Sequence, residues 1–426
     1  MTATITGSAG EVLKTKKRVL TRRGVIWLGQ TCNQRCYFCY FLNKISNESH
    51  PEHAFMSFDK AKQICKTLVD FYHNNAIDIQ GGEPTIYREI LDLCQYCHDI
   101  GLYPTLITNG IALSQEGKLE QYRDHGLRDF LVSLHGIGKV HDQVVGAPGA
   151  YGCITKALEG MVRLGIPRRI NCTMSKPVVP LIPEIARKSI EYGALAVNYI
   201  AFNPFEDQKA GIRTHENVPR YSDLRGPLTE ALDMLEEAGI EANVRYVPLC
   251  MAEPRHRKNF YNFQQLPYDT HEWDYESWMW TMMYPQRMRD SSLNATYRLG
   301  YGASGLYRSD AFQRRDAFEQ SPVKGRIKYG VQHVLARVES AVRGRDALYR
   351  EEAKLRASVD CGYRYHDGCN RCALKNICDG FHGDYADLFG TAEAKPATDL
   401  RPIDDPLYFI KDQVKVVEPE DKEWAM

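Results

Sequence analysis

Apolar and polar positions follow two kinds of pattern over roughly the first 250 residues. Short apolar runs are typical of buried strands, and apolar residues three or four positions apart are typical of amphipathic helices. Strands are predicted at Gly24–Gln30, Ala76–Gln80, Leu102–Thr108, Phe130–Leu134, Arg169–Met174 and Ala196–Phe202. Helices are predicted at Ser57–Asn74, Tyr87–Asp99, Gly152–Leu164, Ile182–Tyr192 and Pro219–Ala238, the last of them leading into a final strand from Glu241.

Strands that alternate with helices of this length predict a parallel sheet with right-handed crossovers. About six such units fit either a partial barrel or an open doubly wound sheet. Both arrangements place ligands at the carboxyl ends of the strands, so the residues that directly follow each strand are the ones to inspect for chemistry.

The pattern changes after residue 246. We divide the chain into an N-terminal extension (1–23), the strand–helix domain (24–246), an aromatic-rich region (247–360), a cysteine-rich segment (361–395) and a C-terminal tail (396–426). A helix is predicted at Lys324–Val342. The aromatic stretch Phe260–Tyr284 is either ordinary core or a wall over the substrate site.

Charge and composition exclude several classes of protein. The 54 basic residues balance the 54 acidic ones, which argues against a broadly basic nucleic-acid binder. No apolar run approaches the roughly 20 residues that span a bilayer, and no apolar segment follows the basic N-terminus as it would in a secretory signal. We therefore expect a cytoplasmic protein with neither nucleic acid nor membrane as partner. The 13 clustered cysteines then indicate metal ligands rather than disulfides.

Two motifs follow the first two strands. Cys32, Cys36 and Cys39 form a C-x3-C-x2-C run, and three thiolates this close can hold three corners of an iron–sulfur cube while one iron stays open. A zinc site usually has four ligands, and no fourth Cys or His lies nearby in the sequence. The second motif is Gly81-Gly82-Glu83-Pro84, where paired glycines allow a ligand to approach the backbone, although an ordinary turn has the same sequence.

A second cysteine cluster lies near the C-terminus. Cys369, Cys372 and Cys378 fall within ten residues and again indicate a metal. Cys250 is the leading candidate for the fourth ligand, and Cys361 and His382 are its competitors. A structural zinc is the alternative to a cluster here. The other cysteines are interpreted as small core residues: Cys65, Cys94, Cys97, Cys153 and Cys172.

Taken together, the motifs resemble those of the radical S-adenosylmethionine (SAM) superfamily. The resemblance joins CNQRCYFCY and GGEP to ITNG (107–110), SLHG (133–136) and HDQVVGAPGAY (141–151), and covers about the first 250 residues. The later cysteines, with Gly380, Tyr385 and Gly390, resemble the SPASM or twitch extensions of that superfamily. The resemblance implies an α/β fold, a partial (β/α)6 TIM-like barrel followed by a C-terminal cysteine-rich auxiliary-cluster domain.

The resemblance also implies a cofactor site. Cys32, Cys36 and Cys39 would ligate a [4Fe–4S] cluster whose open iron chelates SAM, and reduction would cleave SAM to methionine and a 5′-deoxyadenosyl radical that abstracts hydrogen from a substrate C–H bond. The remaining cofactor contacts would be Phe38 at the adenine, Gly81, Gly82 and Glu83 at the methionine ammonium group, Asn109, Ser133 at the ribose and His135 close by. Many relatives carry an arginine where this chain has Val144-Val145, which leaves the SAM carboxylate to Asn171 or Thr173.

For the second cluster and the substrate, the resemblance implies one auxiliary [4Fe–4S] cluster held by Cys250, Cys369, Cys372 and Cys378. Many relatives of this kind modify a ribosomally made precursor peptide, so such a peptide is the predicted substrate. Because the 23 residues before the barrel are too few for a leader-recognition domain, a separate recognition protein is expected, with a flavodoxin or ferredoxin as reductant. The alternatives are a sugar or aminocyclitol substrate and a non-catalytic iron–sulfur carrier. No general base is assigned.

Overall fold

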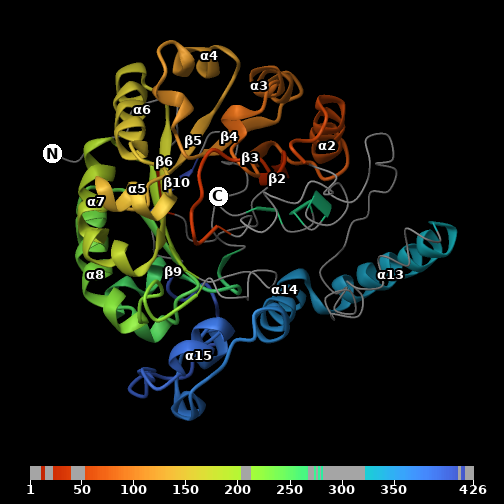
Figure 1. Cartoon of the computed structure of the whole chain (residues 1–426). Coiled ribbons are helices and arrows are strands. Elements are labelled where there is room, and N and C mark those ends of the chain that lie inside the picture. Colours follow the sequence, from red (N-terminus) through yellow and green to blue (C-terminus); the bar gives the residue numbers. More distant parts are fainter. Residues whose placement is uncertain are drawn as a thin grey trace.

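The structure is a computed structural model that describes residues 11–14, 23–39, 53–202, 213–266, 273–274, 277–278, 280–281, 322–410 and 414–417. Its largest feature is a curved sheet of eight strands in which every neighbouring pair is parallel (Figure 1). The order across the sheet is the order along the chain: β2 (Arg23–Trp27), β3 (Ala76–Gln80), β4 (Tyr103–Thr108), β5 (Asp129–Ser133), β6 (Arg168–Met174), β7 (Ala196–Ala201), β8 (Glu241–Arg245) and β9 (Phe260–Tyr261). The partial barrel is confirmed, because a doubly wound sheet would reverse its strand order.

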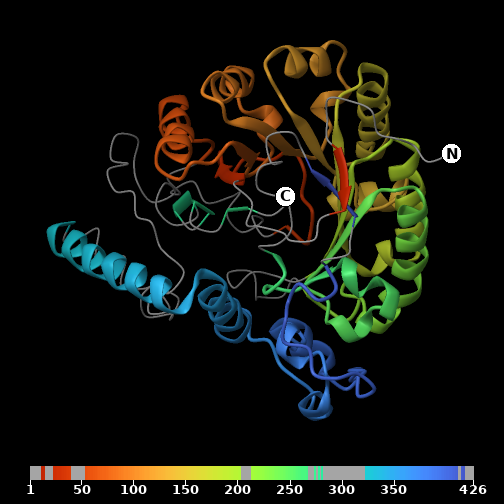
Figure 2. The ribbon, with the colours of Figure 1, turned by 180° about the vertical axis from the view of Figure 1, so that it is seen from behind.

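Helices cover the convex face of the sheet in both views (Figures 1 and 2). Ser57 begins the first of them as predicted, since its side chain accepts a hydrogen bond from the Lys60 backbone N–H. The short polar helices α4 and α5 were not predicted, because neither carries an apolar stripe long enough to recognise. The outer helices are α2 (Phe58–Asp70), α3 (Ile90–Asp99), α4 (Lys118–Asp124), α5 (Lys139–Val145), α6 (Ala150–Leu164), α7 (Ile182–Glu191) and α8 (Tyr221–Glu237).

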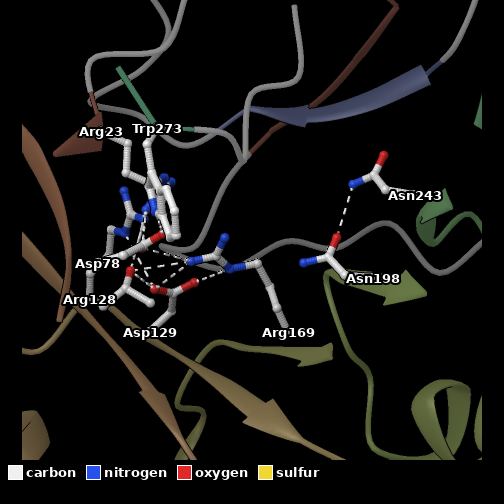
Figure 3. Close-up of polar contacts among 9 residues, drawn as sticks. Arg23, Asp78, Arg128, Asp129, Arg169, Asn198, Asn243 and Trp273 are labelled. Atoms are coloured by element: carbon white, nitrogen blue, oxygen red, sulfur yellow. Dashed lines mark hydrogen bonds and ion pairs between the residues drawn. The ribbon is translucent and has the colours of Figure 1, made fainter. Parts of the chain in front are cut away.

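Charged side chains fill the inside of the barrel near the amino ends of the strands (Figure 3). Arg169 Nε donates to Asp129 Oδ2 at 2.7 Å, and Arg23 Nη1 donates to Asp78 Oδ1 at 3.3 Å. All four side chains are buried. Buried charges are tolerated when they are paired and hydrogen-bonded, and this layer meets both conditions. The barrel therefore has a polar floor beneath its open carboxyl end.

The stability of the fold depends on the ionisation of one carboxylate in this polar floor, that of Asp129. Burial by itself raises the pKa of Asp129, but the charges of Arg169 and Arg23 outweigh burial and hold the pKa below its usual range. A carboxylate with a lowered pKa contributes stability above its unfolded pKa of about 3.9, and that contribution is lost as the pH falls through the folded pKa.

We expect Asp129→Asn to lower the free energy of unfolding by about 3–5 kcal/mol at neutral pH, because it leaves buried arginines without their counter-charge. The difference from the unchanged protein should shrink as the pH falls below about 4, where the carboxylate of the unfolded chain becomes protonated, and should be smallest below the folded pKa. Urea unfolding followed by circular dichroism across this pH range measures both effects. Asp70→Asn is the matched control, since it removes only an exposed partner of Lys66 and should cost less than about 1 kcal/mol. A difference that stays constant with pH would contradict the prediction.

The chain after β9 returns to the other edge of the sheet, at the floor. The backbone N–H of Asp274 donates to the Arg23 carbonyl at 2.7 Å, and Trp273 pairs with Arg23 as an isolated parallel bridge. The Trp273 indole Nε1 donates to Asp78 Oδ2 at 2.7 Å (Figure 3). This part of the aromatic stretch thus lies at the end opposite the expected wall over the site. Much of the rest of that stretch, including 267–272 and 282–284, lies outside the described residues.

Two segments that sequence analysis assigned to the extension and the tail form an antiparallel pair. They are β1 (Glu11–Lys14) and β10 (Val414–Val417). Figures 1 and 2 both show this ribbon within the curve of the sheet, and β10 lies beside β8. The two ends of the described chain therefore meet inside the half-barrel, a long-range pairing that neither short sequence signals alone.

The C-terminal part adds α13 (Pro322–Arg343), α14 (Arg345–Leu355) and α15 (Gly383–Phe389). Helix α13 confirms the predicted helix at 324–342. Tyr385 of α15 stacks on Tyr221 at 3.7 Å between ring centroids, and its hydroxyl accepts the Tyr221 backbone N–H at 2.9 Å, which attaches the cysteine-rich segment to the start of α8. Among the described helices, none has the length and apolarity needed to cross a bilayer. Short helical segments of three to six residues lie at Pro84–Ile86, Ala112–Ser114, Lys176–Leu181, Leu249–Met251, Pro254–Asn259, Arg356–Asp360, Asp367–Arg371 and Lys375–Ile377.

Candidate functional site

Three thiols lie on the loop that leaves the carboxyl end of β2. Burial raises the pKa of Cys32 to about 11 and that of Cys36 well above its ordinary value, and the neighbouring thiols raise both further. The Cys39 backbone N–H donates to the Cys36 carbonyl at 3.0 Å, which holds the second and third cysteines in a tight turn. Buried thiolates in such proximity need positive charge, and an iron–sulfur cluster supplies it by binding them directly. This donor set therefore fits a cluster.

The glycine pair after β3 packs directly against this loop. Gly82 has a φ of +57°, and a Cβ there would lie 2.0 Å from the Thr31 carbonyl oxygen. The Glu83 backbone N–H donates to that same oxygen at 2.9 Å. Only glycine fits position 82, because both the positive φ and the close approach exclude a side chain. The turn thus fixes the GGEP segment to the residue that precedes Cys32.

Glu83 is buried and its carboxylate is surrounded by donors. Oε1 accepts from the Thr85 N–H at 3.0 Å, from the Thr85 hydroxyl at 2.5 Å and from the Thr108 hydroxyl at 2.7 Å, while Oε2 accepts from the Asn109 N–H at 2.7 Å. Burial raises the pKa of Glu83, and these hydrogen bonds partly offset it. Sequence analysis assigned the carboxylate to the methionine ammonium group. In the structure it also ties β3 to the end of β4, a role that spacing alone did not indicate.

Asn109 completes the connection to the cysteine loop. Its side-chain Nδ2 donates to Asn33 Oδ1 at 2.7 Å, and Asn33 follows Cys32 directly. Asn33, Glu83 and Asn109 are therefore joined by one set of hydrogen bonds, although they follow three different strands. Asn33 is a site residue that sequence analysis missed, since no spacing relates it to Asn109.

The candidate ribose and carboxylate contacts lie on adjacent strands. Ser133 of β5 is paired in register with Asn171 of β6, and the Leu134 backbone N–H donates to the Asn171 carbonyl at 2.9 Å. Ser133, Asn171 and Thr173 are half-buried. The structure thus brings the three polar side chains together at the carboxyl end of the barrel, where barrel enzymes bind their ligands.

Two aromatic side chains face each other beside the cysteine loop. The Phe38 ring meets the His135 ring edge-on at 4.7 Å between centroids, and Phe202 lies 6.1 Å from Phe38. Phe38 comes from between the second and third cysteines, and His135 comes from the end of β5. The predicted adenine contact and the predicted ribose neighbour are therefore in contact with each other.

The valines that replace the arginine of relatives are core residues of α5. Val144 and Val145 are buried, and the Val145 carbonyl accepts the Arg35 backbone N–H at 2.9 Å. This segment thus supports the cysteine loop through its backbone. The assignment of the SAM carboxylate to Asn171 or Thr173 stays a prediction.

The four predicted auxiliary ligands gather in one place. Cys250 follows β8 by a few residues, and its pKa is raised to about 11, first by burial and then by the charges of Cys369 and Cys372. Burial raises the pKa of Cys378, and Cys250 raises it further. Cys250 lies beyond the carboxyl end of its strand, so both cysteine groups are attached to the same end of the barrel.

The competing ligands are engaged elsewhere. Cys361 packs with a separate apolar cluster around Tyr261 and Tyr363. The His382 Nδ1 accepts the Asp384 backbone N–H at 3.3 Å and begins α15. Cys250 is therefore the fourth thiol that the structure places beside Cys369, Cys372 and Cys378.

A platform after β9 supports the Cys378 corner, and sequence analysis missed it. The Asp379 backbone N–H donates to Asn262 Oδ1 at 3.0 Å, and its carboxylate accepts the Phe263 N–H at 2.6 Å. Gln265 Nε2 donates to the Ile377 carbonyl at 2.8 Å. The two partners of each of these hydrogen bonds lie more than 110 residues apart in the sequence, so only the fold shows that they meet.

Most of the remaining cysteines confirm their interpretation as core. Cys65, Cys94, Cys97 and Cys172 are buried in the main apolar cluster, whereas Cys153 is half-buried on α6. In the described residues, no three His, Cys, Asp or Glu side chains converge as ligands of one ion would. Thiolates around a four-iron cluster bind separate irons and need no common centre.

Comparison with known proteins shows which family part of the barrel resembles. Residues 28–184 match the family model for the radical SAM superfamily, a span that holds the first cysteine group, the glycine pair, Asn109, Ser133, His135 and Asn171. This part of the chain is similar to a radical SAM domain. SAM and a [4Fe–4S] cluster are the cofactors of this superfamily, and its matching homologues are enzymes. The auxiliary cysteines lie outside the matched span.

Individual relatives are distant. The chain is 24% identical over 224 residues to a probable GTP 3′,8-cyclase of Sulfurisphaera tokodaii, which covers 52% of this chain and 68% of that protein. It is 29% identical over 119 residues to a PqqA peptide cyclase of Bradyrhizobium diazoefficiens, covering 28% and 31%. SuiB of Streptococcus suis is a similar solved structure, with 19% identity, a TM-score of 0.42 and coverage of 56% and 51%. Each of these matches covers only part of both proteins, and the match to the peptide cyclase covers less than a third of that protein.

Proposed function

We propose that this protein is a radical SAM enzyme whose catalytic [4Fe–4S] cluster is held by Cys32, Cys36 and Cys39. The observation that carries the proposal is the hydrogen-bonded connection of the cysteine loop to Glu83 and Asn109. A simple electron carrier needs thiols alone, whereas this loop is packed against a glycine turn that carries the buried carboxylate of Glu83. When bound and reduced, the cluster and SAM supply a 5′-deoxyadenosyl radical that removes hydrogen from a substrate.

The residues around the loop divide the binding of SAM among them. Gly81 and Gly82 let the turn pack against the β2 strand and its loop, which places Glu83 at the amino-acid end. Phe38 and His135 enclose the adenosine end, and the polar pair of Ser133 and Asn171 lies between adjacent strands. The order of these groups along the barrel edge, from β3 through β6, supports one extended ligand bound across the carboxyl ends.

The second part of the proposal is an auxiliary [4Fe–4S] cluster held by Cys250, Cys369, Cys372 and Cys378. Four buried or half-buried thiols support a metal there, and the pKa values of Cys250, Cys369 and Cys378 are each raised first by burial and then by a neighbouring thiol of the group. Its place beyond β8, at the same end of the barrel as the first group, suits an acceptor for an electron from the substrate. A structural zinc is the alternative, because zinc also takes four cysteines.

Metal content tests both parts. We expect about eight irons per chain after anaerobic reconstitution, as two four-iron clusters require, together with 5′-deoxyadenosine when dithionite and SAM are added to the same sample. About four irons with one zinc would keep the radical enzyme and make the second site structural. Iron without SAM cleavage, both alone and with candidate substrates, would favour the carrier.

For the substrate we propose a ribosomally made precursor peptide, presented by a separate leader-recognition protein, with a flavodoxin or ferredoxin as electron donor. The similarity to a peptide cyclase and the second cluster support this class. The similarity to a probable GTP cyclase, which covers more of the chain, supports a small molecule such as a sugar or aminocyclitol instead. Capture of candidate peptides by the purified enzyme, followed by mass spectrometry after turnover, separates the two classes: a peptide mass change supports the first, and turnover of the small molecule alone supports the second.

A further inference from the structure

His135 occupies an unusual position at the end of β5. Its side chain is enclosed between the ring of Phe38, 4.7 Å away and edge-on, and the ring of His141, which lies parallel to it at 6.3 Å. The His135 backbone N–H donates to His141 Nδ1 at 3.1 Å. One histidine therefore holds the other in place, and the held ring lies against the aromatic side chain that projects from the cysteine loop.

The ring nitrogens of His135 have different environments. Nδ1 accepts the backbone N–H of Thr173 at 2.9 Å and so carries no proton. Burial, with a smaller effect from His141, lowers the pKa of His135 to about 3, so the imidazole is neutral at working pH. A neutral imidazole whose Nδ1 accepts must carry its proton on Nε2.

This Nε2–H makes no hydrogen bond to any residue that the structure describes. A purely structural histidine would need only its Nδ1, which continues the β5–β6 hydrogen bonding one step beyond the Leu134–Asn171 bond. Its second nitrogen is left as a donor of fixed orientation beside Phe38. A donor that no described residue uses is available to an acceptor atom of a ligand.

We propose that His135 Nε2–H donates a hydrogen bond to an acceptor atom in the adenosine part of SAM, and that Thr173 and His141 are the positioning residues that fix its tautomer and orientation. The inference rests on the proposed function, because it takes SAM to lie against Phe38. It adds a directional contact that selects adenosine by its acceptor pattern, whereas stacking on Phe38 would accept many flat groups.

Two substitutions test the roles of the two ring nitrogens of His135 separately. His135→Asn retains an acceptor for the Thr173 N–H but cannot reach the Nε2 position, whereas His135→Gln presents an amide N–H near that position. Binding is measured by equilibrium dialysis with SAM on the reconstituted, oxidised protein without reductant, so that no turnover occurs. We expect the dissociation constant to rise about tenfold in the Asn variant and to stay within about threefold in the Gln variant, as expected for one buried hydrogen bond.

Analogues of SAM that each lack one acceptor identify the partner atom. The 7-deaza, 3-deaza and 2′-deoxy analogues are compared on the unchanged protein and on His135→Asn. We expect one of them to bind about tenfold more weakly than SAM to the unchanged protein and equally well to the variant, because the contact is already absent there. A merely structural role of His135 would not produce this selective loss.

Three outcomes would overturn the proposal. Unchanged SAM binding by His135→Asn would show that His135 makes no such hydrogen bond to SAM. Parallel loss of binding and of thermal midpoint in both variants, with no analogue distinguished, would make His135 a structural residue. Failure of the unchanged, reconstituted protein to bind SAM at all would overturn the proposed function together with this inference, whereas the first two outcomes leave the proposed function intact.

Discussion

Cys36→Ala is expected to abolish SAM cleavage. In the proposed site the three thiols on the β2 loop are the protein ligands of the first cluster, and loss of the middle one leaves two. Removal of a group one step further from a metal typically costs about 10- to 100-fold in metal affinity or activity, so loss of a direct ligand should exceed that. The measurement is 5′-deoxyadenosine formed under dithionite, together with iron content, which should fall from about eight to about four per chain.

The matched control is Cys153→Ala. Cys153 is a half-buried thiol on α6 that belongs to neither cysteine group. It should retain both the iron content and the rate of SAM cleavage. Normal 5′-deoxyadenosine formation by Cys36→Ala would refute the assignment of the first cluster. Equal losses in both variants would show that the effect comes from damage to the fold rather than from a missing ligand.

The barrel itself could be predicted from local sequence because each strand is short, apolar and followed by a helix. Ala76–Gln80 is predicted to the residue, since a buried run ends there at two glycines. The first cysteine group and the GGEP turn were equally visible, because their chemistry depends on spacing within a few residues. These features need no knowledge of which distant segments meet.

The parts that were missed all depend on contacts between distant segments. Trp273 pairs with Arg23 across 250 residues, and β1 pairs with β10 across most of the chain. Neither partner carries a pattern that identifies the other. The polar floor was missed for a different reason, since Asp78 lies inside a predicted strand and Asp129 precedes one, and neither position by itself indicates a buried partner. Their burial is favourable only with arginines from other strands beside them.

The second cysteine group could be predicted from the sequence only in part. The spacing of Cys369, Cys372 and Cys378 indicated a metal, but it left three candidates for the fourth ligand. The fold favours Cys250 because β8 delivers it to the carboxyl end of the barrel, while Cys361 and His382 pack elsewhere. The supporting platform of Asn262, Gln265 and Asp379 carries no sequence signal, since amides and carboxylates at those positions are common on any surface.

Cys372→Ala is expected to stop substrate turnover while SAM cleavage continues. Cys372 lies in the cysteine-rich segment, where its Sγ accepts the Ala397 backbone N–H at 3.3 Å, and it contacts neither Glu83 nor the β2 loop among the described interactions. Iron should fall from about eight to about four per chain, as in Cys36→Ala, yet 5′-deoxyadenosine should still form within a few-fold of the normal rate.

Cys36→Ala and Cys372→Ala are therefore expected to lose the same amount of iron but to have opposite effects on SAM cleavage. If the auxiliary cluster accepts an electron from the substrate, Cys372→Ala should consume SAM without yielding product, and the ratio of 5′-deoxyadenosine to product should rise by at least about tenfold. A structural zinc predicts something else, namely loss of zinc, a lower thermal midpoint and an unchanged ratio in whatever enzyme remains folded. Full turnover by Cys372→Ala would exclude an electron-accepting role, because a site that loses a quarter of its ligands without effect on the product cannot lie on the path of the reaction.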